Sequence, residues 1–409
     1  MMKQAASWVI HISAIVIVWT LSINAAPPGP NYHGIRSMGM GNTTVAVTTD
    51  RTAIFHNPAG LGLLRDKVQI SSRPLIFAID GEFFDYLELL GKYKDEMSDI
   101  ETIAGNTQFM DDISSRDGYW AGVEYIPEIT VATKNLGFGI YSVWPIGLRI
   151  ETGHFIPKLG FRGRRDLVFT WAVGIPLKHE SNHFGVSLEY LQRSDLDSRI
   201  TTYSETFFYF EEASKSPFGV IGDLSNLQHG ASFDIGFMHD LFPGFRLAYS
   251  VKDLFGVVGG RVFVPRLDLG CAYYVPPIEN LAFLRSIIAS FEITDLWGFE
   301  EKTEKYEQFG KKIHLGAEID LQYLALRGGI NQGYPTFGLG VMAGPVSLDY
   351  VYYTEESGYY AGQMPRSKHV VSLGLALNVA AQGGYEANDE EISELSSLSP
   401  DQSSFSTDD

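Results

Sequence analysis

Residues 313–321 read Ile-His-Leu-Gly-Ala-Glu-Ile-Asp-Leu, with apolar side chains at every odd-numbered position and polar residues or Gly at every even one. Successive side chains of a β-strand point to opposite faces, so a strand over this stretch has one apolar face and one polar or small face. The same alternation recurs at residues 184–190, 233–238 and 346–352. A soluble β-sandwich would show the same alternation, so the period alone predicts strands without deciding between a soluble protein and a membrane barrel.

Strands of this kind fill most of the chain after residue 67. We predict fourteen of them, near residues 68–80, 119–133, 136–151, 166–178, 183–196, 229–239, 244–254, 264–275, 285–296, 311–321, 323–331, 335–343, 345–354 and 367–379.

The lengths of the connections separate the two all-β classes. Connections after even-numbered strands are mostly tight, as at residues 134–135 and 344–345, whereas 276–284 is longer. Those after odd-numbered strands are mostly long, as at residues 81–118 and 197–228. Short periplasmic turns and long external loops are typical of outer-membrane barrels. We therefore predict an all-β fold, a 14-stranded antiparallel transmembrane barrel over residues 68–380, with both termini on the periplasmic side.

The composition is compatible with a barrel and argues against a nucleic-acid-binding protein and a polytopic helical membrane protein. Charged residues make up 20% of the 409 residues, and the formal net charge of −18 argues against nucleic acid as a partner. The mean hydropathy of −0.02 excludes a polytopic helical membrane protein but not a barrel, whose two faces average out. Cys271 is the one cysteine, so a closed hydrogen-bonded barrel would stabilise this exported chain in place of disulfides.

The N-terminal residues predict export, and the C-terminal residues predict a disordered tail. Lys3, an apolar run over residues 8–23 and small residues at 24–26 are typical of a signal peptide, here residues 1–26; an uncleaved anchor is the alternative. Residues 381–409 are rich in Ser, Asp and Glu and contain no Lys or Arg. They predict a disordered, solvated periplasmic tail, with binding of a basic partner as the alternative.

Between these parts lies the Gly-rich stretch 34–64, which is neither a strand nor an amphipathic helix. It contains Gly39 and Gly41 and ends in Asn57-Pro58-Ala59-Gly60. The run from Gly39 superficially resembles a phosphate loop, but it lacks the required Lys and no strand precedes it. We interpret residues 27–67 as a compact plug that folds into the lumen of the barrel.

Three features of the barrel region are candidates for function. Residues 82–104 carry apolar residues at helical spacing (Phe84, Leu87, Leu90, Tyr93 and Met97) and form either a helix over the external mouth or a polar surface loop. Phe207, Phe208 and Phe210 could capture an apolar ligand, or could belong to a strand that extends above the membrane. Pro145, followed by Gly147, interrupts a predicted strand and indicates either a bulge or a lateral opening in the wall.

No linear motif for catalysis or metal binding is present. HExxH, GxSxG and CxxC patterns are absent from the sequence, and the histidines lack ligand spacing. We expect no catalytic residue, no metal and no cofactor, although a barrel enzyme whose Asp, Ser and His residues are scattered along the chain would leave no linear signature.

The N-terminal stretch resembles the hatch of FadL-type outer-membrane proteins. The resemblance rests on Gly39-Met40-Gly41 and on the run from Phe55 to Leu61, and the same opening is similar to PorV-type barrels. It implies that Asn57, Pro58 and Ala59, with Gly60 beside them, are hatch residues. It also implies a kinked third strand with a lateral exit, and Pro145 lies in the predicted third strand. The last strand departs from the usual pattern, because it does not end the chain on an aromatic residue.

These observations predict a non-enzymatic protein of the outer membrane of a diderm bacterium. Its partners would be the lipid bilayer and a hydrophobic small molecule, and the resemblance implies passive uptake of hydrophobic compounds such as long-chain fatty acids. The alternative is a PorV-like accessory barrel that binds a periplasmic or secretion protein without transporting a solute.

Overall fold

A computed structural model describes residues 32–64, 68–93, 106–115, 120–151, 158–177, 181–196, 200–201, 227–276, 283–297, 309–358 and 361–379. The predicted signal peptide (1–26), the acidic tail (381–409) and the loop residues Phe207, Phe208 and Phe210 lie outside this set.

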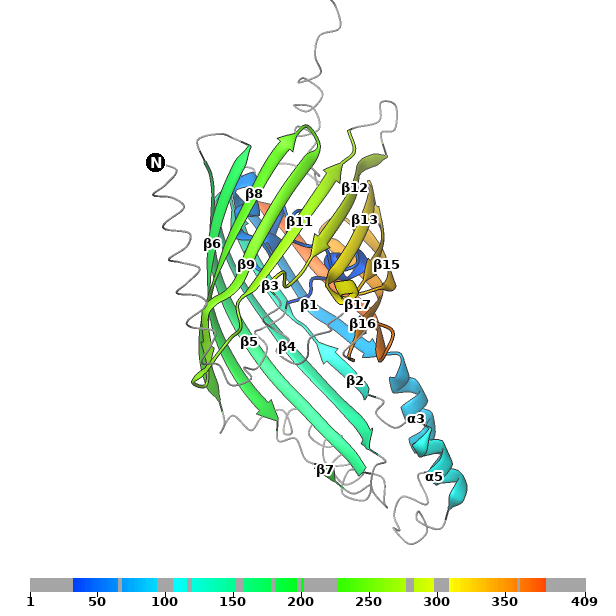
Figure 1. The fold of residues 1–409 in the computed structure, drawn as a ribbon. Helices are drawn as coiled ribbons and strands as arrows, with labels where there is room; N and C mark the ends of the chain where they lie inside the picture. The colour runs from blue at the N-terminus through cyan, green and yellow to red at the C-terminus, as the bar shows by residue number, and fades with distance from the viewer. Residues whose placement is uncertain are drawn as a thin grey trace, which may run out of the picture.

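The described strands form one closed antiparallel barrel, as predicted (Figure 1). The strands are β1 (Val68–Asp80), β2 (Trp120–Tyr125), β3 (Glu128–Thr133), β4 (Leu136–Glu151), β5 (Lys158–Pro176), β6 (Asn182–Leu196), β7 (Ile200–Thr201), β8 (Gln228–Phe242), β9 (Phe245–Val258), β10 (Arg261–Val262), β11 (Arg266–Tyr274), β12 (Leu284–Ile293), β13 (Ile313–Leu321), β14 (Leu324–Asn331), β15 (Tyr334–Ala343), β16 (Val346–Glu356) and β17 (Pro365–Val379).

The count of fourteen follows from how these segments pair. β2 and β3 are two parts of one strand between β1 and β4, and β7 and β10 are two-residue additions. The ring closes because β1 pairs with β17, from Val68 opposite Val379 to Asp80 opposite Lys368. The predicted range 119–133 is divided at Ile126 and Pro127, and β5 begins earlier than the predicted residue 166.

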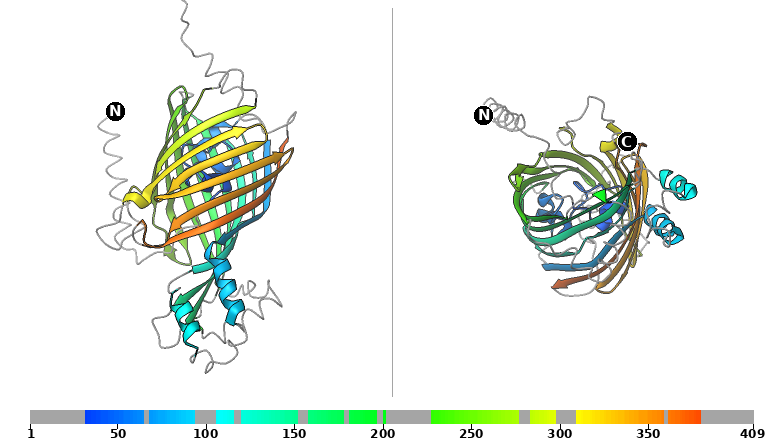
Figure 2. Two further views of the ribbon diagram at one scale, coloured as in Figure 1. Left: turned by 90° about the vertical axis from the view of Figure 1, so that its right-hand side faces the viewer. Right: turned by 90° about the horizontal axis from the view of Figure 1, so that it is seen from below.

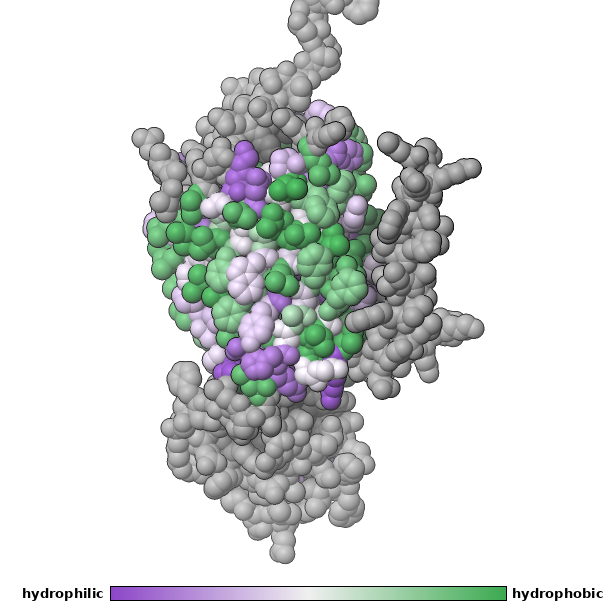
Figure 3. All heavy atoms as spheres, turned by 90° about the vertical axis from the view of Figure 1, so that its left-hand side faces the viewer, coloured by the Kyte–Doolittle hydropathy of each residue, from purple (hydrophilic) through white to green (hydrophobic). Residues whose placement is uncertain are grey.

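The two faces of the barrel have opposite polarity. Trp171, Leu188 and Leu348 are exposed on the outside, whereas Asp166 and Asp349 are buried on the inside. On the face in Figure 3, apolar side chains cover most of the central band and polar residues gather toward its two ends. An apolar outer band around a polar interior is the arrangement that a lipid bilayer requires of a barrel, so these strands span an outer membrane.

Two helices lie beyond one end of the ring (Figure 2). α3 (Glu82–Tyr93) confirms a helix in the first part of residues 82–104, and α5 (Thr107–Ser114) packs beside it. The buried face of α3 is Tyr86, Leu89 and Tyr93. The predicted apolar stripe is thus only partly correct: Phe84 and Leu87 are exposed, because α5 covers the neighbouring face. No helix among the described residues is long and apolar enough to cross a membrane.

Residues 32–64, here called the internal segment, lie inside the ring (Figures 1 and 2). They form the short helix α2 (Ile35–Gly39) and two 3₁₀ helices, η1 (Arg51–Ile54) and η2 (Pro58–Leu63). The Asp50 side chain accepts the Thr52 N–H at the start of η1. Asn57 caps η2 in the same way, with Pro58 at a first-turn position that needs no N–H.

Candidate functional site

One half of the internal segment rests on glycines of the barrel wall. These glycines, here called the glycine seat, are Gly137 and Gly139 of β4, Gly174 of β5, Gly185 of β6 and Gly236 of β8. A Cβ atom built on Gly185 would lie 2.3 Å from the Ala59 nitrogen, and one on Gly236 would lie 1.9 Å from Asn57 Oδ1. Only glycine allows so close an approach, and this explains the small residues on the inner face of these strands.

Asn57-Pro58-Ala59-Gly60 occupies this seat as one unit. The fully buried Asn57 side chain accepts the Ala59 N–H at 3.1 Å and donates to the Val45 carbonyl at 2.9 Å. A Cβ on Gly60 would lie 2.0 Å from the Thr48 carbonyl oxygen. Asn57 therefore ties the seated residues to the preceding half of the internal segment.

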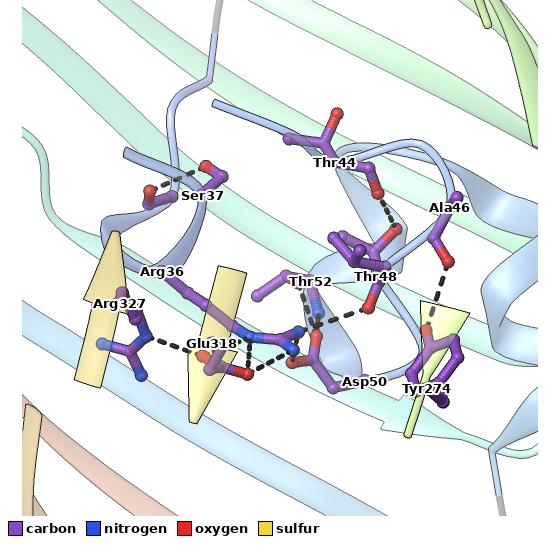
Figure 4. A network of polar contacts seen from close by, with 12 residues as sticks. Arg36, Ser37, Thr44, Ala46, Thr48, Asp50, Thr52, Tyr274, Glu318 and Arg327 are labelled. Carbon is purple, nitrogen blue, oxygen red and sulfur yellow. Dashed lines mark hydrogen bonds and ion pairs between the residues drawn. The ribbon is translucent and has the colours of Figure 1, made fainter. Parts of the chain in front are cut away.

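The other half of the internal segment is held by buried charges (Figure 4). Arg36 donates to both oxygens of Glu318 at 2.6 to 3.0 Å, and Arg327 donates to Glu318 at 2.7 Å. Arg327 also reaches Asp349 at 3.0 Å, and Arg36 lies 3.7 Å from Asp50. We call Arg36, Glu318, Arg327 and Asp349 the charge clamp; it joins the internal segment to β13, β14 and β16.

Further polar bonds hold the loop that follows α2. Glu292 of β12 accepts the N–H groups of Thr44 at 2.6 Å and Val45 at 2.8 Å. The Thr43 and Ser290 hydroxyls lie 2.7 Å apart, and Tyr274 donates to the Ala46 carbonyl at 3.2 Å. These contacts are made by side chains, so this half depends on individual polar groups of β11 and β12.

The two predicted glycines of this half fit tightly against the wall. Gly41 has a φ of +63°, donates to the Thr336 hydroxyl at 3.0 Å, and would place a Cβ 2.1 Å from the Leu315 carbonyl oxygen. A Cβ on Gly39 would lie 3.2 Å from the Gly338 Cα. Gly41 is therefore required both by its backbone conformation and by the close approach.

An apolar cluster lies between the internal segment and β3 to β9. At its centre, the rings of Tyr32, Phe55 and Tyr141 have centroids 4.5 to 5.0 Å apart. Leu191, Val258 and Phe263 belong to the same buried cluster. Tyr32 also donates a hydrogen bond to Glu128, whose carboxylate lies 3.1 Å from Arg73 Nη1. A packed apolar cluster is therefore present in a lumen that also carries many polar side chains.

Burial shapes the protonation of the internal segment. Burial, and then the Lys252 ammonium, lowers the pKa of His56 to about 3. Burial also lowers the pKa of His33. For Asp50, burial would raise the pKa, but the guanidinium groups of Arg36 and Arg51 outweigh it and hold the pKa below its ordinary value. Both histidines are therefore neutral when the internal segment is in place.

The wall is irregular at Pro145, where the sequence predicted a bulge or an opening, and again on a neighbouring strand. β4 is continuous and Pro145 pairs with Glu124 of β2, but on the other side of β4 the ladder with β5 is interrupted between Val143 and Ile146. Gly147 pairs with Gly122, and a second interruption lies at Ile126 and Pro127, between β2 and β3. β1 changes register opposite β17 between Ser72 and Leu75, a stretch that contains Pro74.

We call residues 73–76 and 126–127 the seam. Proline carries no N–H for a sheet ladder, and across the seam Ile126 donates to the Ile76 carbonyl at 2.9 Å. On the inner side, Ile126 and Ile76 pack with Ile35 and Met38 of the internal segment.

Aromatic rings line the outer side of the seam. The Phe77 and Tyr125 rings are stacked 5.0 Å apart, and Tyr125 meets Trp144 edge-on at 5.5 Å. Tyr125 also donates to the Pro74 carbonyl at 2.7 Å. Pro74 and Pro127 were not predicted to mark an irregularity. Both lie within predicted strands at similar depth, and proline inside a strand indicates a bulge or a break in the ladder.

Several solved outer-membrane proteins resemble this chain. The toluene transporter TbuX of Ralstonia pickettii shares 14% identity, with 84% of this chain and 97% of that one covered and a TM-score of 0.44. The toluene transporter TodX of Pseudomonas putida shares 14% identity over 86% of this chain and 98% of that one, with a TM-score of 0.41. CymD, a monoaromatic hydrocarbon channel, shares 12% identity over 89% of this chain and 100% of that one, with a TM-score of 0.42.

No family model matches the sequence, and no curated protein matches it either. The fold assignment therefore rests on the chain's own strand pairing and lipid-facing surface, which confirm the predicted 14-stranded antiparallel barrel.

Proposed function

We propose that this protein is a plugged outer-membrane channel through which hydrophobic compounds, long-chain fatty acids among them, cross passively. The observation that carries the proposal is the apolar cluster around Tyr32, Phe55 and Tyr141, which lies against the internal segment in a lumen lined by polar groups. A water-filled pore would conduct sugars, whereas a hydrophobic solute needs apolar side chains along its path. No energy source is required.

In this proposal residues 27–67 act as a hatch, of which only one half moves. Asn57, Pro58, Ala59 and Gly60 stay on the glycine seat, because their main chain is fitted to the wall. Residues 32–48, with Gly39 and Gly41, move when the polar side-chain bonds to Glu318 and Glu292 break.

The proposed exit is lateral, through the seam and the adjoining Pro145 and Gly147. Movement of residues 32–48 withdraws Ile35 and Met38 from Ile76 and Ile126 and uncovers the inner side of the seam. An apolar solute would then enter the lipid without crossing the periplasmic mouth. Capture on the external side is assigned, as a proposal, to Phe207, Phe208 and Phe210.

Uptake of labelled oleate by cells that lack their own transporter tests the proposal. Cells that make the protein should accumulate oleate faster than cells with an empty vector. Susceptibility to vancomycin, a large polar antibiotic, should stay the same in both, since a hatch-filled barrel is not an open hole. Equal oleate uptake with and without the protein would overturn the proposal.

A further inference from the structure

The ladder between β1 and β2 is the shortest main-chain link that either strand makes in the described part of the ring. Phe77 to Ile79 lie opposite Val123 to Tyr125, three residue pairs in all. On its other side β2 pairs with β4 over six residues, and β1 pairs with β17 along most of its length. We call this short ladder the β1–β2 joint, and it directly adjoins the seam. Because unpaired main-chain groups are costly in a membrane, a wall opens most readily where the fewest bonds must break.

Side chains on the inner face reinforce the joint across β1. Lys368 of β17 donates to Glu124 of β2 at 2.9 Å, and Arg366 of β17 lies 3.5 Å from the same carboxylate. Since β1 pairs with β17 on one side and with β2 on the other, both contacts pass over β1. They therefore link β17 to β2 in a way that the main chain does not.

Both cations keep other partners if Glu124 leaves. Lys368 also lies 2.6 Å from Glu355 of β16, and Arg366 donates to the two oxygens of Asp80 at 2.7 to 2.9 Å. The Glu124 side chain is already partly exposed and would move with β2. The large penalty for breaking a buried ion pair comes from the charge that is left unpaired, and here neither cation would be. This ion pair is therefore suited to a contact that forms and breaks.

A hydroxyl group holds the outer face of the joint at the next residue of β2. Tyr125 donates to the Pro74 carbonyl of β1 at 2.7 Å, and its ring stacks on Phe77. Pro74 lies at the register change of β1, between the paired residues Ser72 and Leu75. Consecutive residues of β2 thus hold the joint from opposite faces, the first by charge and the second by a neutral hydrogen bond.

The helices α3 and α5 tie the two strands together at the far end of the joint. α3 begins at Glu82, soon after β1 ends at Asp80 (Figure 1). Its buried face packs with α5 on Ala121 of β2. This apolar contact links the end of β1 to β2 beyond the three residue pairs of the ladder. The joint can therefore part only from its seam end.

We propose that the wall opens where the β1–β2 joint parts from its seam end, and that Glu124 and Tyr125 are the positioning residues that keep it closed. This inference rests on the proposed function and gives its lateral exit a place and a control. A parted joint connects the inner side of the seam, which Ile35 and Met38 cover, to the aromatic rings on its outer side. Withdrawal of the first half of the internal segment and release of Glu124 are then two separate steps of exit.

Amide hydrogen exchange of the purified full chain tests the role of Glu124 without any solute. Glu124→Gln should accelerate exchange at residues 123–125 by about 10-fold, the effect of losing a charge-assisted hydrogen bond. Glu355→Gln is the matched control, because it also removes a carboxylate from Lys368 but leaves the contact with β2 in place. Equal exchange at residues 123–125 in the two variants would overturn the role of Glu124.

The same measurement tests Tyr125. Tyr125→Phe keeps the ring and removes the hydroxyl, so exchange at residues 123–125 should accelerate by about 3-fold, as expected for one neutral hydrogen bond. The matched control is Tyr350→Phe, which removes a hydroxyl bond to His369 on another pair of strands and should leave these amides unchanged. Exchange in Tyr125→Phe that equals the control would overturn the role of Tyr125.

A reversible crosslink tests whether the joint is the exit. In a Cys271→Ser background, Ile79→Cys with Val123→Cys joins β1 to β2, and Leu75→Cys with Leu373→Cys joins β1 to β17 as the matched control. Oxidation of the first pair should stop oleate uptake and reduction should restore it, whereas oxidation of the second pair should leave uptake unchanged. Uptake that persists with β1 and β2 crosslinked would overturn the joint as the exit.

The two readouts separate this inference from the proposed function. Accelerated exchange in Glu124→Gln, with no oleate uptake by the unmodified chain, would retain the parting joint and overturn transport. Oleate uptake through a barrel whose β1–β2 joint is crosslinked would retain transport and overturn the joint.

Discussion

The internal segment meets the barrel in two regions of contrasting chemistry. Residues 35–48 are held by charged and polar side chains of β11 to β16, above all the charge clamp and Glu292, together with a close main-chain fit of Met40 and Gly41 against wall glycines. Residues 54–62 are held because their main chain fits the glycine seat of β4 to β8. Side-chain bonds can break one at a time and depend on charge, whereas a steric fit is lost only if the wall itself changes. The first region depends more on charged side chains than the second, and we therefore assign movement to the first region and anchoring to the second.

The largest effect is expected from removing the centre of the charge clamp. Glu318→Ala leaves Arg36 and Arg327 without their shared carboxylate, and breaking a buried pair in this way costs about 3–5 kcal/mol. Amide hydrogen exchange of Gly41, Thr44 and Val45 should accelerate accordingly, while that of Ala59 and Gly60 stays slow. Equal acceleration in both regions would contradict the distinction between them.

A smaller but reciprocal effect is expected from filling the glycine seat. Gly185→Ala places a methyl group 2.3 Å from the Ala59 nitrogen, and overpacking of this kind costs about 1–3 kcal/mol. Exchange at Ala59 and Gly60 should accelerate more than exchange at Thr44. Gly328→Ala is the matched control on β14, because its nearest added contact is the Thr336 carbonyl oxygen at 4.0 Å. Similar exchange in the two variants would argue against the seat.

Asn57→Ala tests the connection between the two regions. Its side chain bonds Val45 in one region and Ala59 in the other, and the loss of these buried bonds should cost about 1–2 kcal/mol. Exchange should accelerate moderately in both regions at once. A change confined to η2 would show that Asn57 acts as a helix cap alone.

The smallest and most gradual effect is expected from acid. The Tyr32 ring packs on the His56 ring at 5.2 Å, so withdrawal of residues 32–48 opens His56 to water. His56 then takes up protons below about pH 6.5, whereas with residues 32–48 in place it does so only near pH 3, so protons favour withdrawal in this window. Protease resistance of residues 32–48 should be constant above pH 7 and fall as the pH drops from 6.5 toward 3. His56→Gln should flatten this dependence; an unchanged profile in that variant would exclude His56 as the cause.

The sequence alone predicted the strands from their repeated alternation of polarity, but it did not predict which distant residues contact one another. Alternation such as that of residues 313–321 predicted the strands, and Asn57 to Gly60 fall together as one unit because they are adjacent in the chain. The partner of Arg36 could not be predicted, since Glu318 is distant in sequence and one of many strand carboxylates.

The seam and Arg51 escaped prediction for a similar reason. Pro145 was noticed because it interrupts a clear pattern, but the seam depends on which residues of β1 and β2–β3 lie opposite each other. Arg51 looks like an ordinary charged residue until its burial is known.

Reversible crosslinks test most directly the claim that residues 32–48 move and residues 54–62 stay. In a Cys271→Ser background, Thr43→Cys with Ser290→Cys replaces two hydroxyls 2.7 Å apart, and Ile54→Cys with Gly137→Cys joins positions where an added Cβ lies 2.5 Å from Ile54 Cγ1. Oxidation of the first pair should stop oleate uptake and reduction should restore it, whereas oxidation of the second pair should leave uptake unchanged. Uptake that persists with the first pair crosslinked, or stops with the second, would contradict the account.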